Sequence, residues 1–310
     1  MAAAEETGGE HNVIVTEEIS DYANNIQQFI DQDYDVIVTV GFLIGTDTTT
    51  AAKANPDVTF VGVDQGICIT AEAEPDPTFA CEGDPAELLP NYQGVIFAEA
   101  QPGYLAGIVA ASLSESGTIA AIGGTNVPAV VNYWRGYENG ATSVNEDIEV
   151  LYQETDPDPA KGFADPARGK AIAQQQIGQG ADVLFQIAGL TGQGAVEAAC
   201  DADIIAIGVD VDQSQTLPNL AQCIVTSAEK KLKESVTSAI LGAASGDFEA
   251  GNVVYDASDD PPGIGLSPFN PDIELPDDVE AAVEEAFNAL ADGSLDPCQP
   301  VACTVSGEAP

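Results

Sequence analysis

The sequence predicts an α/β protein whose parallel sheets are covered by helices on both faces. Strand-like and helix-like segments alternate along most of the chain, and such alternation is typical of parallel sheets with helical crossovers. Several of the strand-like segments are continuous β-branched runs, as expected for strands that are buried on both faces. The 310 residues, 45% of them hydrophobic, suffice for two α/β domains of ordinary size or one large one.

The first sixty residues contain three short apolar runs separated by two helical patterns. In the first helical pattern, apolar residues recur three and four positions apart, which is the spacing of one helix face. We expect strands over residues 13–16, 35–40 and 58–63, and helices over residues 20–32 and 46–54.

The remainder of the chain continues this alternation after a loop. The segment 71–91 contains four prolines and several acidic residues, so we expect no regular structure there. We expect helices over residues 103–114, 135–145, 166–178, 192–199, 227–241 and 277–290. The strands expected among them are 117–123, 149–154, 182–187, 204–209, 253–256 and 264–266.

The charge balance excludes several classes of partner. The chain has 51 Asp and Glu against 8 Lys and Arg, which gives a formal net charge of -43 and a pI near 4.1. Such a surface repels nucleic acid phosphates and anionic lipid headgroups, so we expect neither partner. Solubility in a salty medium explains the acidity without reference to a ligand.

Neither a membrane span nor a signal peptide is visible in the sequence. No run of 18 or more apolar residues occurs. The opening residues, MAAAEETGGEHNV, lack the basic and apolar regions of a signal peptide. Any argument for export therefore depends on other features.

The six cysteines predict local disulfides. None forms a CxxC pair, and the single histidine, His11, cannot complete a zinc site with them. Cys68 with Cys81, and Cys298 with Cys303, would each close a segment rich in proline and acidic residues; Cys200 and Cys223 are the remaining two. Disulfides persist in oxidising compartments, so this interpretation favours the cell exterior or periplasm. Six buried free thiols are the alternative.

Candidate site residues follow the predicted strands, because ligands of open parallel sheets bind beyond the carboxyl ends of the strands. These positions are Phe42, Asp64, 161–170, 189–194, Asp210 and Asp212. The run GLTGQG at 189–194 is a G-x-x-G-x-G pattern that does not meet the dinucleotide fingerprint. Its glycines allow either a tight turn or close approach of the backbone to a neutral ligand.

The carboxylates and lysines near these strand ends leave alternatives open. For Asp210 and Asp212, two residues apart at a strand end, we expect different directions, with one side chain as a ligand contact and the other in a structural role. Lys230, Lys231 and Lys233, at the start of a predicted helix, are three of only eight basic residues. One of them has a site role, or all three form a solvated face.

No catalytic or metal-binding constellation is present in the sequence. A single histidine excludes most His-based acid–base chemistry and both kinds of nucleophilic triad. Walker A, H-E-x-x-H and G-x-S-x-G motifs are all missing. We therefore expect no catalytic residue, no metal site and no cofactor, and predict that the protein is not an enzyme.

Six runs resemble, in order, the basic membrane protein family of nucleoside-binding lipoproteins. These are type I periplasmic binding proteins that serve ATP-driven importers. The runs span roughly residues 13–269 and read DYANNIQQFIDQDYDVIVTVGFLIG, GYLAG, GFADPARGKAIA, GADVLFQIAGLTGQG, IGVDVDQ and TSAEKK.

The resemblance implies two doubly wound parallel-sheet lobes with a ligand cleft between them. The lobes expected from it are residues 1–98 with 227–250, and residues 99–226 with 251–270, followed by a C-terminal helix and disulfide-stapled tail over 271–310. Family members begin with a strand and an Asp-x-Ser-Phe-Asn motif, which this sequence lacks. We therefore expect a gap in the first sheet, and a signal segment and lipid anchor upstream of this chain.

The resemblance also implies roles for five residues. Asp64 would hold polar groups of the ligand, Phe163 would stack on the base, and Gly189 would contact it through its backbone. Asp210 and Lys230 would bind the ribose hydroxyls and neighbouring polar atoms. A core aromatic is the alternative for Phe163.

By the same resemblance, the function is that of an extracytoplasmic solute-binding protein of an ABC importer. It would capture a nucleoside, a purine nucleoside by preference, without changing it chemically. Its partners would be the permease subunits, and it would be attached to the membrane through a lipid anchor only. The alternatives are a ligand-sensing receptor ectodomain and an α/β enzyme acting on a sugar or nucleoside.

Overall fold

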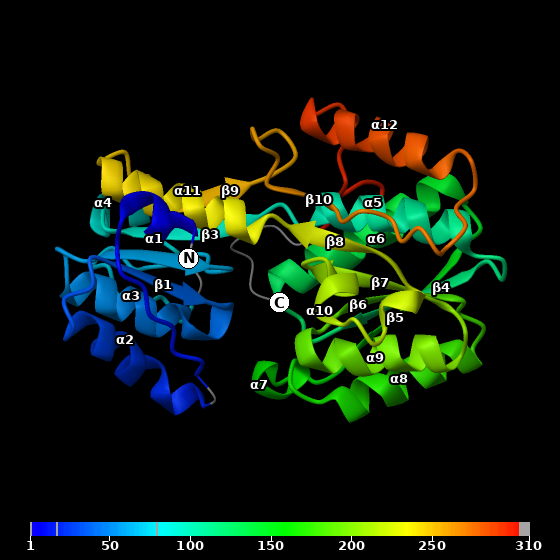
Figure 1. Cartoon of the computed structure of the whole chain (residues 1–310), viewed down its shortest axis with the longest axis horizontal. Coiled ribbons are helices and arrows are strands. Elements are labelled where there is room, and N and C mark those ends of the chain that lie inside the picture. The colour runs from blue at the N-terminus through cyan, green and yellow to red at the C-terminus, as the bar shows by residue number, and fades with distance from the viewer. Residues whose placement is uncertain (1, 17, 79, 304–310) are drawn as a thin grey trace. The chain divides into compact units, whose positions relative to one another are not determined.

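Two sheets, each covered by its own helices, organise the chain in the computed structural model (Figure 1). The structure describes residues 2–16, 18–78 and 80–303. Among the described residues, unit 1 comprises those up to Phe97 together with Leu232–Tyr255, and unit 2 comprises Ala98–Lys231 together with residues 256–303. The prediction of an α/β fold with parallel sheets is confirmed.

The sheet of unit 1 is entirely parallel. Among the described residues its strand order is β1-β2-β3-β9. The strands are β1 (Val36–Val40), β2 (Thr59–Val63), β3 (Tyr92–Phe97) and β9 (Gly251–Tyr255). The helices of this unit are α1 (Ala2–Thr7), α2 (Tyr22–Ile30), α3 (Gly45–Ala54), α4 (Pro85–Leu88) and α11 (Leu232–Ser245).

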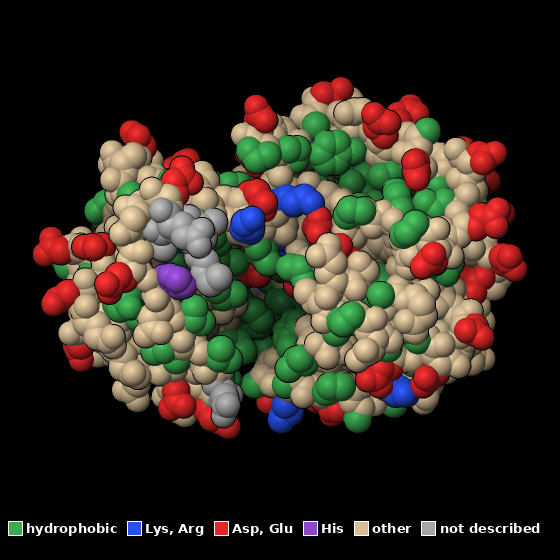
Figure 2. Space-filling model, in the orientation of Figure 1, with side chains coloured by type: hydrophobic (Ala, Val, Ile, Leu, Met, Phe, Trp, Pro, Cys, Tyr) green, Lys and Arg blue, Asp and Glu red, His purple; other side chains and the backbone are tan. Residues whose placement is uncertain are grey.

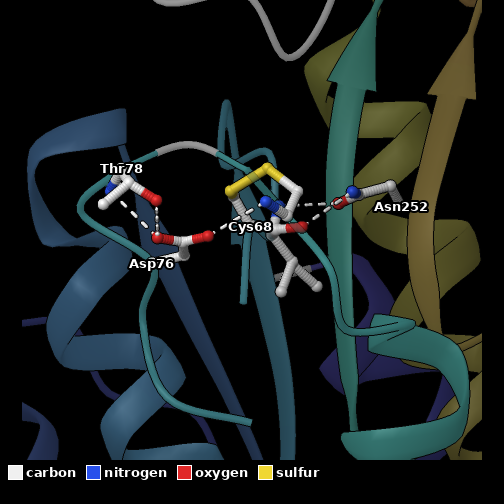
Figure 3. The surroundings of a disulfide bond; sticks show 6 residues. Cys68, Asp76, Thr78 and Asn252 are labelled. Carbon is white, nitrogen blue, oxygen red and sulfur yellow. Dashed lines mark hydrogen bonds between the residues drawn. A yellow bond between two sulfur atoms is a disulfide. The ribbon is translucent and has the colours of Figure 1, made fainter. Parts of the chain in front are cut away.

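The long loop of unit 1 is held by covalent and polar links (Figure 3). Cys68 and Cys81 form a disulfide. The Asn252 side chain, on β9, accepts from the backbone N–H of Ile67 at 2.7 Å and donates to its carbonyl at 3.0 Å. Asp76 accepts from the backbone N–H of Cys81 at 3.0 Å. These links add to the packing of Ile67 and Ile69, which are buried in the core of unit 1.

The sheet of unit 2 is parallel except at one edge. Among the described residues its order is β10-β8-β7-β6-β4-β5, with β10 antiparallel to β8. The strands are β4 (Thr118–Gly123), β5 (Glu149–Glu154), β6 (Val183–Ile187), β7 (Ile205–Asp210), β8 (Ile224–Lys230) and β10 (Ile264–Leu266). The helices are α5 (Ala100–Leu113), α6 (Pro128–Val144), α7 (Pro159–Gly162), α8 (Pro166–Gly178), α9 (Gly189–Asp201), α10 (Gln213–Thr216) and α12 (Val279–Ala291).

Helices bury both faces of this second sheet. Ile119 and Phe185 belong to a cluster with residues of α5 and α6, whereas Ile122 and Leu184 belong to a cluster with residues of α8 and α9. Figure 1 shows these helix pairs on opposite sides of the sheet. Successive strand residues therefore enter two cores, which explains their continuous apolar runs.

The α5–α6 contact depends on glycines. A Cβ atom at Gly107 would lie 2.1 Å from the carbonyl oxygen of Tyr137, and one at Gly140 would lie 2.0 Å from that of Tyr104. Real Cβ atoms do not approach a carbonyl oxygen this closely. The two helix backbones can therefore touch only because no side chain separates them.

Several segments differ from the elements expected from the sequence. The helix α4 lies within the segment 71–91, where we expected no regular structure; the Asp84 side chain caps it and Pro85 is its first residue. The short helices α1, α7 and α10 are also additional to the expected elements. Residues 13–16 form no strand, and Val13 and Val15 are 73% and 84% exposed. The strand β3 was not expected at all. The helix predicted over 227–241 is wrong at its start, because residues 224–230 form β8 and the helix α11 begins at Leu232.

The chain passes between the two units after Phe97, Lys231 and Tyr255. β8 pairs with β7 in unit 2, and β9 pairs with β3 in unit 1. The expected gap in the first sheet is not observed, because β1 pairs directly with β2; within the described residues β1 is an edge strand. The C-terminal helix α12 packs on α5, within unit 2.

All six cysteines are paired, as the local-disulfide interpretation predicted: Cys68–Cys81, Cys200–Cys223 and Cys298–Cys303. On the face shown in Figure 2, acidic side chains are spread over both units, while lysines and arginines are few. Within the described residues, no helix has the length and hydropathy needed to cross a membrane.

Candidate functional site at the strand ends

The topology of unit 2 selects one place for a ligand. β4 pairs with β5 on one side and with β6 on the other, so the connections leaving β4 and β5 run in opposite directions across the sheet. Open α/β sheets bind ligands at the carboxyl ends of the strands where the order reverses in this way. The segments beyond β4 and β6 are therefore the first place to search.

Phe163 lies at this point of the sheet. It follows α7, and its ring is packed so tightly on Gly124, beyond β4, that a Cβ there would lie 2.2 Å from Cε1. A Cβ at Gly189, beyond β6, would lie 3.6 Å from Phe163 Cδ1. The ring is half-buried: it packs partly on the core of unit 2 and keeps part of its surface exposed. The buried part of the ring fits the core-aromatic alternative, and its exposed part leaves a surface on which a base could stack.

A set of hydrogen bonds fixes the Phe163 segment. The hydroxyl of the fully buried Thr155 lies within hydrogen-bond distance of the carbonyl oxygens of Gly124 and Gly162. The backbone N–H of Thr191 donates to the Phe163 carbonyl at 3.3 Å. Sequence reasoning missed Thr155, because its partners lie 31 and 7 residues away and no motif marks it.

Gly189 begins α9 with a left-handed backbone, φ +54°. Only glycine adopts this conformation without strain at most positions. The tight turn and the close approach to Phe163 therefore occur together at Gly189.

Asp210 and Lys230 form an ion pair at adjacent strand ends. Asp210 ends β7 and Lys230 ends β8, and the Lys230 Nζ lies 3.5 Å from Asp210 Oδ1. The lysine side chain is 5% exposed and that of Asp210 is 44% exposed. The expectation that Lys230 starts a helix is corrected here: its place at the end of a strand aims it at the same edge of the sheet as Gly189.

The neighbouring candidates have local roles. Asp212 is the N-cap of α10 and accepts from the backbone N–H of Ser214 at 3.1 Å. Lys231 pairs with Glu229. Lys233 is exposed on α11, in unit 1.

Asp64 belongs to unit 1, where it directly follows β2. Its backbone N–H donates to the Val95 carbonyl at 2.9 Å, and its φ is +58°. Phe42, also beyond a strand of this sheet, is 38% exposed. The structure thus places one proposed ligand residue in unit 1 and the other four in unit 2.

The two units share a strand-end arrangement that sequence reasoning missed. In each, a Gly-Val-Asp run lies at the carboxyl end of a strand, β2 or β7. A glutamine one or three residues after the aspartate folds back onto the glycine. A Cβ at Gly62 would lie 2.3 Å from Gln65 Oε1, and one at Gly208 would lie 2.8 Å from Gln213 Oε1. The Asp backbone is left-handed in both, with φ +58° at Asp64 and +65° at Asp210. The repeated letters GVD are the signal that could have revealed it.

Both glutamines form hydrogen bonds with residues of neighbouring strands. Gln65 is 2% exposed, accepts from the Tyr92 hydroxyl at 2.6 Å and donates to Thr39 Oγ1 at 3.0 Å. Gln213 accepts from the Gln186 amide at 2.7 Å. A hydrogen-bonded glutamine therefore lies one residue after Asp64 and three residues after Asp210.

Comparisons with known proteins agree with this architecture. Residues 4–287 match the model of a family described as ABC transporter substrate-binding protein PnrA-like. The chain is 34% identical over 202 residues to the ABC transporter nucleoside-binding protein BmpA of Lactococcus lactis, and 30% identical over 219 residues to basic membrane protein B of Borreliella burgdorferi. These alignments cover 63% and 70% of this chain.

The chain spans little more than half the length of these two relatives, since the alignments cover 51% and 58% of them. Among solved structures, a solute-binding protein of an ABC transporter system from Aeropyrum pernix K1 superposes with a TM-score of 0.75 at 23% identity. That superposition covers 95% of this chain and 85% of the Aeropyrum chain. At this identity the likeness shows a shared fold.

Proposed function

Because the chain belongs to the family of PnrA-like ABC transporter substrate-binding proteins, we propose that it captures a nucleoside outside the cytoplasm and delivers it unchanged to the permease subunits of an importer. The observation that carries the proposal is the edge of the unit 2 sheet: the half-buried Phe163 ring lies at the strand-order reversal, and the Asp210–Lys230 pair lies at neighbouring strand ends. The name of the Lactococcus relative supports the same ligand class.

The chemistry of these residues suits a base joined to a sugar. An aromatic face stacks on any base, a contact worth about 1–3 kcal/mol. A carboxylate and an ammonium form charge-assisted hydrogen bonds with hydroxyl groups, and such bonds are about twice as strong as neutral ones. Phe163 would therefore hold the base while Asp210 and Lys230 hold the ribose, and Gly189 offers its backbone beside the ring.

Two finer parts of the proposal follow from the same features. We favour a purine, because its fused ring offers the larger surface to stack on Phe163. Asp64, at the end of β2 in unit 1, would supply a further polar contact.

The proposed location is outside the cytoplasm. The three disulfides favour an oxidising compartment, and we propose that a lipid anchor attaches the protein to the membrane.

Calorimetric titration with inosine, guanosine, adenosine, cytidine and free ribose tests the ligand class. We expect the purine nucleosides to bind most tightly and to be recovered intact by chromatography after prolonged incubation. At a concentration about 100 times its dissociation constant, a ligand adds about 2.7 kcal/mol of stability, so the melting temperature should rise as well. Chemical conversion of a nucleoside would favour an enzyme, and the absence of binding by every nucleoside would refute the proposal.

Substitutions separate the base contact from the sugar contact. Phe163→Ala should weaken nucleoside binding by about fivefold to 150-fold, the equivalent of the lost stacking. Asp210→Asn should weaken binding of ribonucleosides more than that of their dideoxy analogues. Phe248→Ala, which removes a half-buried loop phenyl group of unit 1, is the matched control and should leave affinity unchanged.

A further inference from the structure

Glu99 is a buried carboxylate that the proposed contacts leave without a role. It directly precedes α5 as its N-cap residue and is 4% exposed. Its Oε1 lies 3.6 Å from the Lys230 Nζ, and the side-chain amide of Asn132, on α6, donates to its Oε2 at 3.4 Å. Glu99 and Asp210 therefore both lie close to the same ammonium.

The surroundings of Lys230 explain why it needs a second carboxylate. A buried ammonium is costly unless opposite charges lie beside it. The groups near the Nζ include Glu99 before α5, Asp210 on β7 at 3.5 Å, and the Tyr133 ring on α6 at 5.5 Å from its centroid. The positive charge therefore has two carboxylates and an aromatic face among its neighbours.

The two carboxylates differ in their access to solvent. The Glu99 side chain is 5% exposed, whereas that of Asp210 is 44% exposed. Glu99 also stands at the N-terminus of a 14-residue helix, where the helix dipole favours a negative charge. Only Asp210 is placed where a dissolved molecule can reach it.

We propose that Glu99 is a positioning residue for the ligand site. It balances the charge of Lys230 within the protein and holds the ammonium at the end of β8, so that Asp210 can accept hydrogen bonds from ligand hydroxyls without being the lysine's principal counter-charge. This inference rests on the proposed function in one respect, namely that Asp210 and Lys230 bind the sugar.

The consequence of removing the Glu99 charge follows directly. In Glu99→Gln the amide keeps the size of the side chain but not its charge, so Lys230 loses one counter-charge and draws closer to Asp210. The ion pair between Asp210 and Lys230 must then be weakened before the Asp210 oxygens can accept a hydrogen bond from a ligand hydroxyl. Affinity for the sugar falls while the base contact at Phe163 is untouched.

A pair of ligands isolates this effect. We expect Glu99→Gln to weaken guanosine binding about tenfold, which is the order of magnitude expected for the loss of one charge-assisted hydrogen bond. Binding of 2′,3′-dideoxyguanosine should stay within about twofold of wild type. A merely structural role would weaken both ligands equally, and that result would overturn the inference. Glu197→Gln, which removes a surface partner of Lys170, is the control and should change neither.

A second measurement is independent of any ligand. In protein labelled with [13Cε]lysine, the Lys230 signal, assigned with Lys230→Met, reports the surroundings of the ammonium. Because the Glu99 carboxylate lies 3.6 Å from the Nζ, we expect Glu99→Gln to change the chemical shift of this signal and Glu99→Asp to restore it in part. An unchanged signal overturns the role of Glu99, whereas a changed signal in a protein that binds no nucleoside overturns the proposed function alone.

Discussion

Replacing Gly124 with alanine should impair ligand binding without touching the ligand. A Cβ at this position would lie 2.2, 2.5 and 2.6 Å from the Phe163 ring atoms Cε1, Cδ1 and Cζ. Carbon atoms pack at about 3.5–4.0 Å. The ring must therefore retreat by more than about 1 Å or turn out of its place against Gly189.

The size of the effect follows from the stacking that is lost. Stacking of a base on an aromatic ring is worth about 1–3 kcal/mol, which corresponds to a factor of about 5 to 150 in the dissociation constant. We expect Gly124→Ala to weaken purine nucleoside binding within that range by calorimetry. Unfolding in urea should show a loss of no more than about 1–3 kcal/mol, the usual cost of overpacking, because the displaced ring belongs to a half-buried loop residue.

A double-mutant cycle makes this reasoning refutable. If Gly124→Ala acts only by displacing the ring, then adding it to Phe163→Ala should cause no further loss of affinity. Losses that add up would show that Gly124 has another role, and wild-type affinity in Gly124→Ala would show that the ring does not contact the base. Gly178→Ala, at a position with nothing within 4 Å of the added Cβ, is the control.

Three further substitutions test the structure around the site. Gly107→Ala should lower the free energy of unfolding in urea by about 1–3 kcal/mol, because α5 and α6 must separate, whereas Gly178→Ala should be neutral or stabilising. Replacing Cys68 and Cys81 together by serine should cost about 3 kcal/mol, the entropy of a 13-residue closure; an unchanged urea midpoint would contradict this. Hydrogen bonds from Thr78 lower the pKa of Asp76. The ionised Asp76 side chain therefore stabilises the folded protein above about pH 4, and this stabilisation is lost as the pH falls below about 4. The melting temperature of Asp76→Asn should depend less on pH in that range than the melting temperature of the wild type.

The sequence was sufficient for the elements whose apolar pattern is strong and local. β5 and α8 have the expected bounds, and most other strands differ by one residue. β3 was overlooked because Gln93 and Gly94 interrupt its apolar run; in the structure both are buried, and the space that a side chain at Gly94 would need is filled by the Gln65 carbonyl and Asn252. Gln93 and Gly94 are buried because of contacts with other parts of the fold. The periodicity of apolar residues along the sequence contains no information about such contacts.

Two other errors have tertiary causes. The end of β8, SAEK, carries charged residues that favour a helix from sequence alone, yet Lys230 is buried in the strand by its pairing with Glu99 and Asp210. Residues 13–16 have a strand-like sequence but form no strand in the structure, although β1 is an edge strand. A strand needs a partner as well as a propensity.

Candidate site residues were predictable to the extent that strand ends define them. The rule that ligands bind beyond the carboxyl ends of parallel strands selected Asp64, Gly189 and Asp210 from the sequence, and the family resemblance added the roles of Phe163 and Lys230. Glu99 and Thr155 could not be found in this way. Their interactions join positions 131 and 31 residues apart, and no local pattern encodes such a pairing.

The left-handed aspartates connect the fold to the proposed function. A non-glycine residue at φ near +60° costs about 1 kcal/mol or more, and such strain persists only where the surrounding structure imposes it. Here the imposing structure is the same in both units: a Gly-Val-Asp run at the carboxyl end of a strand, with a glutamine side chain folded onto the glycine. Glycine at position 64 or 210 would relieve the strain. Asp33 and Asp203 are left-handed as well, so the repetition of the Gly-Val-Asp arrangement in both units, rather than the strain alone, favours the proposed role of the two carboxylates.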